Sequence, residues 1–154
     1  MRDGAVQLTS AGRLRLEDEL AFLRDVKRRE LADRLEDSNE DGDISDNSEY
    51  EDLKEDLVMT DRRIQELEYL LATAEPIEPS QDGSIHLGSV VTIVDSDGEE
   101  ATWTLVDPAE ADTRAGSIST DSPVGRALMG RHPGDSATVE TPGGQIVYTV
   151  VNVA

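Results

Sequence analysis

The sequence contains no cysteine among its 154 residues, and aromatic residues make up only 3% of it. Without cysteine the chain can form no disulfide, no thiolate metal site and no cysteine nucleophile. No apolar run approaches the roughly 20 residues that a membrane-spanning helix needs, and the N-terminus lacks the pattern of a signal peptide. We therefore expect a cytoplasmic protein with an aliphatic core and no membrane association.

Positive charge is also scarce, with 14 Lys and Arg against 34 Asp and Glu and a net charge of −20. Such a surface repels phosphate groups, which argues against autonomous DNA binding. The negative charge is concentrated, because residues 36–56 hold eleven acids and one base, which is half of the net charge. This stretch is therefore the first place to look for a function.

Residues 1–76 show the pattern of two helices that fold back on each other. In the later part, steps of four and three residues alternate in a heptad spacing through Leu53, Leu57, Thr60, Ile64, Leu67 and Leu71. In the earlier part, the aliphatic residues at roughly helical spacing are Leu16, Leu20, Leu23, Val26, Leu31 and Leu35. Because each helix alone would expose its apolar stripe, we predict an antiparallel coiled-coil hairpin with an acidic tip at about residues 41–48.

From residue 77 onwards the apolar pattern changes to a period of two, which is typical of strands. Residues 89–106 predict a hairpin, and residues 136–141 and 145–153 predict two further strands. Ser122 and Pro123 predict the N-cap and first residue of a short helix. The fold class is thus α+β, with the coiled-coil hairpin over residues 1–76 and a small antiparallel β domain with a short helix over residues 77–154.

The acid-rich stretch EDGDISDNSEYED, from Glu40 to Asp52, admits three interpretations from its residues alone. A solvated turn between helices is the one that composition favours. A calcium-binding loop has a similar spacing, but Asp46 stands where such a loop needs glycine, and Asp52 where it needs glutamate. Hydrolysis by paired carboxylates is the third, but a turn between two helices has no surrounding pocket, so a second protein would have to complete that site.

Several ordered motifs resemble the bacterial Gre transcript-cleavage factors, in particular the GreA type, along nearly the whole chain. LTSAGRLRLEDELAFL resembles the start of that family, GDISDNSEYEDLKED its tip, and RRIQELEYLLATAEPI the end of its second helix. LGSVVTI, SPVGRALMGRHPGD and TPGGQIVYTV resemble its second domain, which has an FKBP-like fold.

The resemblance implies an accessory factor of bacterial RNA polymerase and not an enzyme in its own right. In this family the coiled coil enters the secondary channel of the polymerase, while the second domain docks at the rim of the channel. The tip then assists the polymerase in cleaving the 3′ end of a backtracked nascent RNA. The resemblance implies no intrinsic cofactor, because Mg²⁺ is held jointly with the polymerase.

The resemblance also implies which tip residues carry this role. The catalytic acids, which also hold the metal, fall on Asp43 and Asp46. Asp41 and Glu49 are candidates to help these two acids hold the metal, and Asn47 and Tyr50 are the candidate supporting residues of the tip. Asp46 departs from the family, which normally has glutamate there. Because some family members with altered, Asp-rich tips inhibit the polymerase, a second function stays open, in which the protein occupies the channel without stimulating cleavage.

A basic patch that meets the extruded RNA is a further feature of the family. Arg24, Lys27 and Arg28 have the i, i+3, i+4 spacing of one helical face, and we take them as candidates for this patch. The alternative is that they merely pair with nearby acids such as Glu30 and Asp33.

The second domain carries the candidate polymerase-binding loop, which by resemblance includes Asp121, Ser122 and Pro123. His86 and His132 are far apart in sequence and lack the spacing of metal ligands. We expect both histidines to have structural or surface roles.

Overall fold

The computed structural model describes residues 5–40, 47–78 and 82–154. The chain divides into two compact units, Ala11–Ala74 as one and Met1–Ser10 together with Glu75–Ala154 as the other. The hairpin unit therefore ends at Ala74, close to the expected residue 76. The first ten residues, however, group with the second unit and not with the hairpin.

Two sets of contacts explain why the N-terminal residues belong to the second unit. β1 (Gln7–Leu8) pairs in parallel with β2 (Glu75–Pro76). Glu110 is only 3% exposed, and its carboxylate accepts hydrogen bonds from the backbone N–H of Thr9, at 2.8 Å, and from the Thr9 hydroxyl. Buried polar groups need such partners in place of water. This carboxylate therefore fixes the chain just before the first long helix.

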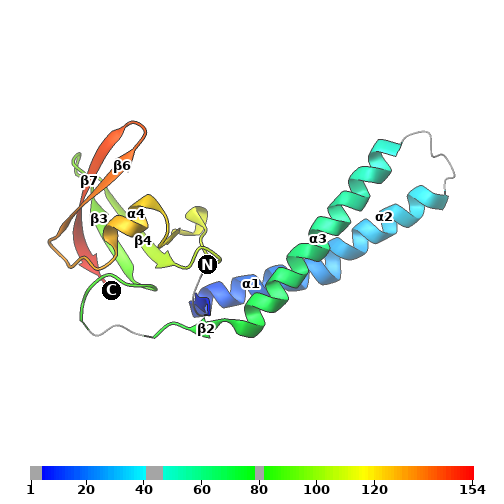
Figure 1. The fold of residues 1–154 in the computed structure, drawn as a ribbon, viewed down its shortest axis with the longest axis horizontal. Helices are drawn as coiled ribbons and strands as arrows, with labels where there is room; N and C mark the ends of the chain where they lie inside the picture. The colour runs from blue at the N-terminus through cyan, green and yellow to red at the C-terminus, as the bar shows by residue number, and fades with distance from the viewer. Residues whose placement is uncertain (1–4, 41–46, 79–81) are drawn as a thin grey trace. The chain divides into compact units, whose positions relative to one another are not determined.

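Ala11–Ala74 forms a hairpin of long helices, as predicted (Figure 1). α1 (Ser10–Phe22) continues through one π-helical turn, η1 (Leu23–Lys27), into α2 (Arg28–Glu40), and α3 (Asn47–Thr73) runs back along this first arm. No described helix combines the length and the apolar character needed to cross a lipid bilayer.

The two arms of the hairpin meet along a seam of buried aliphatic side chains. Its buried members are Leu16, Leu20, Leu23, Leu31, Leu53, Ile64 and Leu67. The half-buried members are Leu35, Leu57 and Leu71. Burial removes apolar surface from water and stabilises the pair by about 25 cal/mol for each Å². Neither arm could form this seam alone, so the hairpin is the unit that folds.

Val26 does not belong to the seam, in contrast to the prediction from its spacing. It is 42% exposed, whereas the next residue, Lys27, is half-buried. A regular heptad step of four residues after Leu23 leads to Lys27 and not to Val26. The turn between them, η1, is π-helical, because the backbone N–H of Arg28 donates to the carbonyl oxygen of Leu23, five residues earlier. Such a turn holds one residue more than an α-helical turn with an i→i+4 bond.

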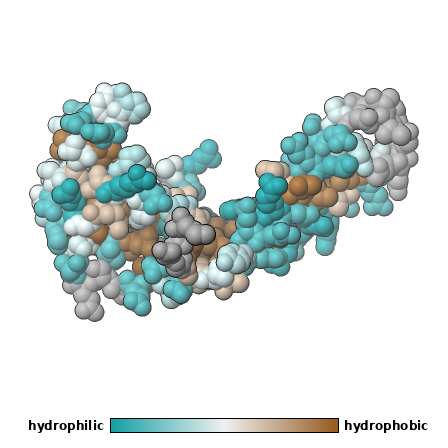
Figure 2. All heavy atoms as spheres, in the orientation of Figure 1, coloured by the Kyte–Doolittle hydropathy of each residue, from teal (hydrophilic) through white to brown (hydrophobic). Residues whose placement is uncertain are grey.

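Charged residues flank the seam and pair across it. Arg63 binds both carboxylate oxygens of Glu19, at 2.8 and 3.2 Å, and this hydrogen bond raises the pKa of the Arg63 guanidinium. Arg13 donates to the backbone oxygens of Leu71 and Ala74, which are carbonyls near the C-terminal end of α3 that lack intrahelical partners. Exposed ion pairs of this kind each contribute less than about 1 kcal/mol to stability. Hydrophilic residues cover most of the visible hairpin surface (Figure 2).

The second unit is built on a five-stranded sheet with the order β5-β4-β3-β7-β6. Its strands are β3 (Val90–Val94), β4 (Glu100–Val106), β5 (Ser117–Ser119), β6 (Ser136–Thr141) and β7 (Gly144–Val153). The predicted hairpins β3–β4 and β6–β7 are confirmed. β5 runs parallel to β4, so the sheet is not wholly antiparallel as expected. A strand of only three residues shows too little alternation to be predicted.

The core of this unit combines alternate strand residues with the short helix α4 (Pro123–Leu128). The buried cluster comprises Ile85, Val91, Ile93, Leu105, Ile118, Leu128, Ala137 and Val150. Trp103 and Tyr148 pack against this cluster and are partly buried. The α+β fold predicted from the sequence is thereby confirmed.

We expect Leu67→Ala to lower the free energy of unfolding by about 2–5 kcal/mol, because it leaves a cavity at a fully buried position of the seam. Leu57→Ala, at a half-buried position, should cost less. Glu66→Gln is the control, because it alters an adjacent exposed side chain and should cost well under about 1 kcal/mol. Denaturant unfolding followed by circular dichroism measures all three. Equal losses for Leu67→Ala and Glu66→Gln would contradict the seam.

Candidate functional site

The acid-rich stretch connects the end of α2 at Glu40 to the start of α3 at Asn47. These two helix ends belong to the same end of the hairpin (Figure 1). The predicted tip acids Asp41, Asp43 and Asp46 lie outside the described residues, so their roles stay predictions. The structure does place the residues that flank them on both arms.

Glu49 and Tyr50 are positioned by the first turns of α3. The Glu49 side chain is exposed, and Tyr50 is half-buried. The ammonium of Lys54 lies 5.2 Å from the centre of the Tyr50 ring, within the range of a cation–π contact. Because Lys54 is one helical turn further along, this contact orients the tyrosine ring on α3. A supporting role for Tyr50 at the tip stays a prediction.

An open recess of about 270 Å³ near this end of the hairpin is lined by Arg34, Asp37 and Ser38 of α2 and by Glu49 of α3. Its lining consists of polar and charged side chains. Arg34, Asp37 and Ser38 are not among the predicted site residues, although their i, i+3, i+4 spacing places them on one helical face. The recess is open to solvent and does not enclose a substrate.

Metal binding finds no support in the part of the chain that the structure describes. There, no group of three or more His, Asp or Glu side chains could hold a metal ion. The first half of the candidate calcium loop, residues 41–46, lies outside that part, so the calcium-loop interpretation stays untested there. A hydrolytic site made by this chain alone would need a pocket around the tip acids, and the open recess does not provide one.

The candidate basic patch lies on η1 and at the start of α2. Arg24 pairs with Glu68 at 3.5 Å, and Arg28 pairs with Asp61 at 2.7 Å. Both partners are acids of α3, not the acids close in sequence that the alternative interpretation named. Lys27 is half-buried at the seam. These side chains thus help to join the arms, and a contact with RNA stays a prediction.

The candidate docking loop lies directly before α4. Ser122 is the N-cap, as predicted, since its Oγ accepts a hydrogen bond from the Gly125 N–H at 3.1 Å and donates one to the Ser119 carbonyl at 2.6 Å. Pro123 occupies the start of the helix. Asp121 and Pro123 are both exposed. The backbone of the loop is therefore well fixed, while the side chains on either side of Ser122 are accessible.

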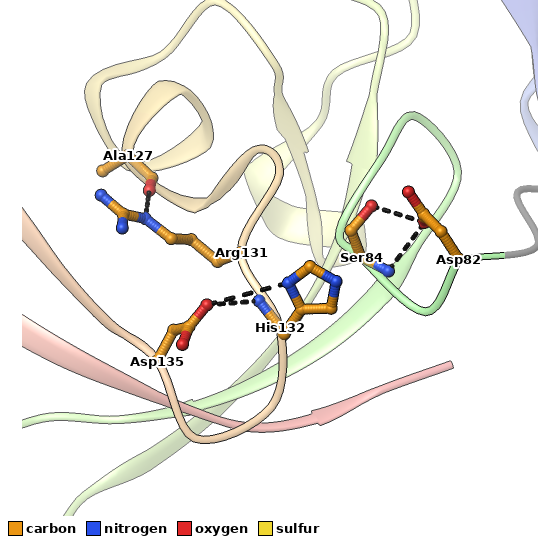
Figure 3. Close-up of polar contacts among 6 residues, drawn as sticks. All are labelled: Asp82, Ser84, Ala127, Arg131, His132 and Asp135. Atoms are coloured by element: carbon orange, nitrogen blue, oxygen red, sulfur yellow. Dashed lines mark hydrogen bonds and ion pairs between the residues drawn. The ribbon is translucent and has the colours of Figure 1, made fainter.

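The two histidines take part in local turns. The backbone N–H of His132 donates to Asp135 at 2.8 Å, and the His132 ring lies 3.9 Å from the same carboxylate (Figure 3). The Nδ1 atom of His86 lies 3.0 Å from the Ser84 carbonyl oxygen and 2.9 Å from the Ser89 hydroxyl. Ser89 is only 1% exposed, which excludes it as an accessible nucleophile. Both histidines thus have the structural or surface roles expected.

Two family descriptions match this chain. "Transcription elongation factor, N-terminal" covers residues 6–75, and "Transcription elongation factor, GreA/GreB, C-term" covers residues 80–154. Among curated relatives, Transcription elongation factor GreA of Chloroflexus aurantiacus is 43% identical over 99% of both chains. Transcription elongation factor GreA of Geobacillus kaustophilus is 42% identical over 95% of this chain and 94% of the relative.

A solved structure of similar length is that of GreA factor homolog 1 (Gfh1) of Thermus thermophilus. It is 35% identical to this chain, the match covers 97% of this chain and 99% of that one, and the TM-score is 0.47.

We expect Gly125→Ala to destabilise the sheet unit by about 1–3 kcal/mol through overpacking. A Cβ atom at this position would lie 2.1 Å from the backbone oxygen of Ser119, so α4 and the docking loop would have to move. Gly143→Ala is the matched control, since its nearest neighbour, the Thr141 hydroxyl, lies 3.9 Å away. Thermal unfolding measures the difference, and coincident melting curves would contradict the close packing of α4.

Proposed function

Because the chain belongs to the GreA/GreB family of transcription elongation factors, we propose that it stimulates cleavage of backtracked RNA by bacterial RNA polymerase. In this proposal the helical hairpin enters the secondary channel of the polymerase, and the acid-rich stretch reaches the active site. One observation carries the proposal. Eleven acids fall in residues 36–56, the part of the sequence that ends α2, joins it to α3 and begins α3, in a chain of this family.

The length of the hairpin fits the proposed insertion of its acidic end into the secondary channel. α3 alone has 27 residues, and at a rise of 1.5 Å per residue it spans about 40 Å. Leu67 in the seam and the Glu19–Arg63 pair hold the arms together over the part remote from the tip. A paired rod of this length can carry side chains deep into another protein, whereas a single helix would expose its apolar stripe.

The chemistry of the tip acids fits a shared metal site. Hydrolysis of a phosphodiester at a two-metal site requires bound ions and a positioned water. Mg²⁺ prefers carboxylate and water oxygens as ligands, and Asp43 and Asp46 offer carboxylates. In the proposed complex these residues ligate an ion that the polymerase also binds and accept a hydrogen bond from the attacking water. The polymerase supplies the remaining ligands and the RNA, so this chain acts as an accessory factor.

The loop at the start of α4 is the proposed docking surface. Its backbone is held by the hydrogen bonds of Ser122, and the accessible Asp121 carboxylate can pair with a basic group on the polymerase. Docking through the second unit would leave the hairpin free to enter the channel. In this proposal the loop provides affinity for the polymerase, and the tip acids take part in RNA cleavage.

A second candidate function is inhibition of the polymerase without stimulated cleavage. It is favoured by Asp46, which stands where the family normally has glutamate and is shorter by one methylene, a reach of about 1.5 Å. Metal coordination tolerates only about 0.2 Å of error in ligand distance. A tip that cannot complete the metal site would still obstruct the channel.

Cleavage of RNA in a stalled, backtracked complex of the cognate polymerase tests the proposal. We expect Asp43→Asn to abolish stimulated cleavage with polymerase affinity nearly unchanged, because it removes a metal ligand and keeps the shape of the side chain. Asp56→Asn is the matched control, since it removes an exposed charge from α3 away from the tip. The RNA products are separated on a gel, and affinity is measured by direct binding.

The same assay separates the two candidate functions. Under the stimulator proposal, wild-type protein shortens the RNA from its 3′ end, and Asp46→Glu raises cleavage at limiting Mg²⁺ by restoring the longer reach. Under the inhibitor proposal, no shortened RNA appears at any pH or Mg²⁺ concentration, and Asp43→Asn relieves a block of nucleotide addition. Full cleavage by Asp43→Asn would reject a catalytic role for the tip.

Docking is tested by Asp121→Ala. We expect weaker binding to the polymerase by about tenfold, because a charge-assisted contact of this kind contributes on the order of 1–3 kcal/mol, with an unchanged melting temperature. Asp97→Ala removes an exposed acid from the β3–β4 turn and serves as the control. Wild-type affinity for the Asp121→Ala variant would show that the docking surface lies elsewhere.

A further inference from the structure

η1 adds one residue to the first arm of the hairpin, and the seam accommodates it. After Leu23, a heptad spacing would place the next two seam positions four and seven residues later, at residues 27 and 30. The buried residue is instead Leu31, eight residues after Leu23. η1 supplies the extra residue, since its bond from Arg28 to Leu23 spans five residues. The first arm therefore contains a one-residue insertion relative to a regular seam.

A polar layer lies at the level of this insertion. Lys27 takes the seam position and is half-buried. On the other arm Thr60 is 3% exposed, and within the described part of the chain its hydroxyl is buried without a hydrogen-bond partner. Arg28 and Asp61, the neighbours of these two residues, form an ion pair at 2.7 Å. Lys27 and Thr60 therefore lie at the same height along the hairpin, and we call them the polar layer.

The hairpin differs on the two sides of the polar layer. The proximal segment, residues 11–23 and 64–73, buries Leu16, Leu20, Leu23, Ile64 and Leu67. The distal segment, residues 28–40 and 47–59, buries two aliphatic side chains of the seam, Leu31 and Leu53, and contains the open recess.

Ion pairs follow the same division. Glu19–Arg63 and Arg24–Glu68 join the arms on the proximal side of the polar layer. Arg28–Asp61 joins them at the polar layer itself, and within the described stretches of the distal segment beyond Arg28 no ion pair links one arm to the other.

We propose that the polar layer is a hinge at which the distal segment opens while the proximal segment stays paired. An unsatisfied buried hydroxyl disfavours the closed state, and opening returns the Thr60 hydroxyl to water. π-helical turns are sites at which helices bend, so η1 allows the first arm to move at the same level. This inference concerns the hairpin itself and goes beyond the function proposed above.

Hydrogen exchange of the full-length protein, resolved by peptide, tests the hinge. In the wild type we expect the distal segment to exchange faster than the proximal segment. Thr60→Val has nearly the same shape and removes the unsatisfied hydroxyl, so distal exchange should slow by about fivefold or more, with proximal exchange unchanged. Thr73→Val makes the same change at an exposed position of α3, where the hydroxyl donates to the Tyr69 carbonyl, and should leave the distal segment unaffected.

Three results would overturn the hinge. In the first, both segments of the wild type exchange together. In the second, Thr60→Val slows both segments equally, which indicates global stabilisation. In the third, Thr60→Val accelerates exchange, which indicates that an internal water satisfies the hydroxyl.

Deletion of Val26 tests the insertion directly. The deleted chain would place Arg28 at the seam position of Lys27 and bring Leu31 and Leu35 into regular heptad spacing. We expect the hairpin to fold with a continuous α-helix as its first arm and with slower distal exchange. Deletion of Met59 from α3 is the control, because it should shift half of the seam out of register and unfold the hairpin. Unfolding by both deletions alike would refute the one-residue insertion.

Discussion

The packing of aliphatic side chains between the two arms is the interaction on which the hairpin and its acidic end depend. Acids crowded into residues 36–56 repel one another and stabilise nothing in the seam. They are tolerated because Leu67 and its neighbours supply the free energy of pairing elsewhere along the arms. Exposed ion pairs such as Arg24–Glu68 are each too weak to replace that packing. Because the seam and not the acidic end stabilises the hairpin, substitutions among these acids should leave the fold intact.

The parts of the structure that local sequence determines were predictable. The heptad spacing of α3 directly indicates which of its side chains are buried, and Thr60 is buried where that spacing places it. Alternating residues identified the β3–β4 and β6–β7 hairpins, and Ser122 followed by Pro123 identified the start of α4. In each case a few neighbouring residues specify the conformation, so no contact distant in sequence is needed to infer it.

Other features depend on contacts that no local pattern reveals. η1 is one such feature, because a π-helical turn leaves only an irregular spacing of leucines as its trace in the sequence. The pairing of Thr9 with Glu110 joins residues about a hundred positions apart, and the parallel pairing of β5 depends on the crossover before it. At the candidate site, the family resemblance implies Asp43 and Asp46, but both lie outside the described residues, and in the proposed function their geometry depends on the polymerase.

Compliance of the distal segment would resolve a difficulty in the proposed function. Metal ligands must be placed within about 0.2 Å, yet a rod about 40 Å long converts a small error in docking angle into ångströms at its end. A rod that is rigid throughout would therefore need docking of unrealistic accuracy. With the proposed hinge, the proximal segment would determine how far the hairpin extends, and the distal segment would bend at Lys27 and Thr60. Contacts in the polymerase site would then fix the final position of the carboxylates. The same freedom would lessen the consequence of the shorter side chain at Asp46, because the backbone can advance where the side chain cannot.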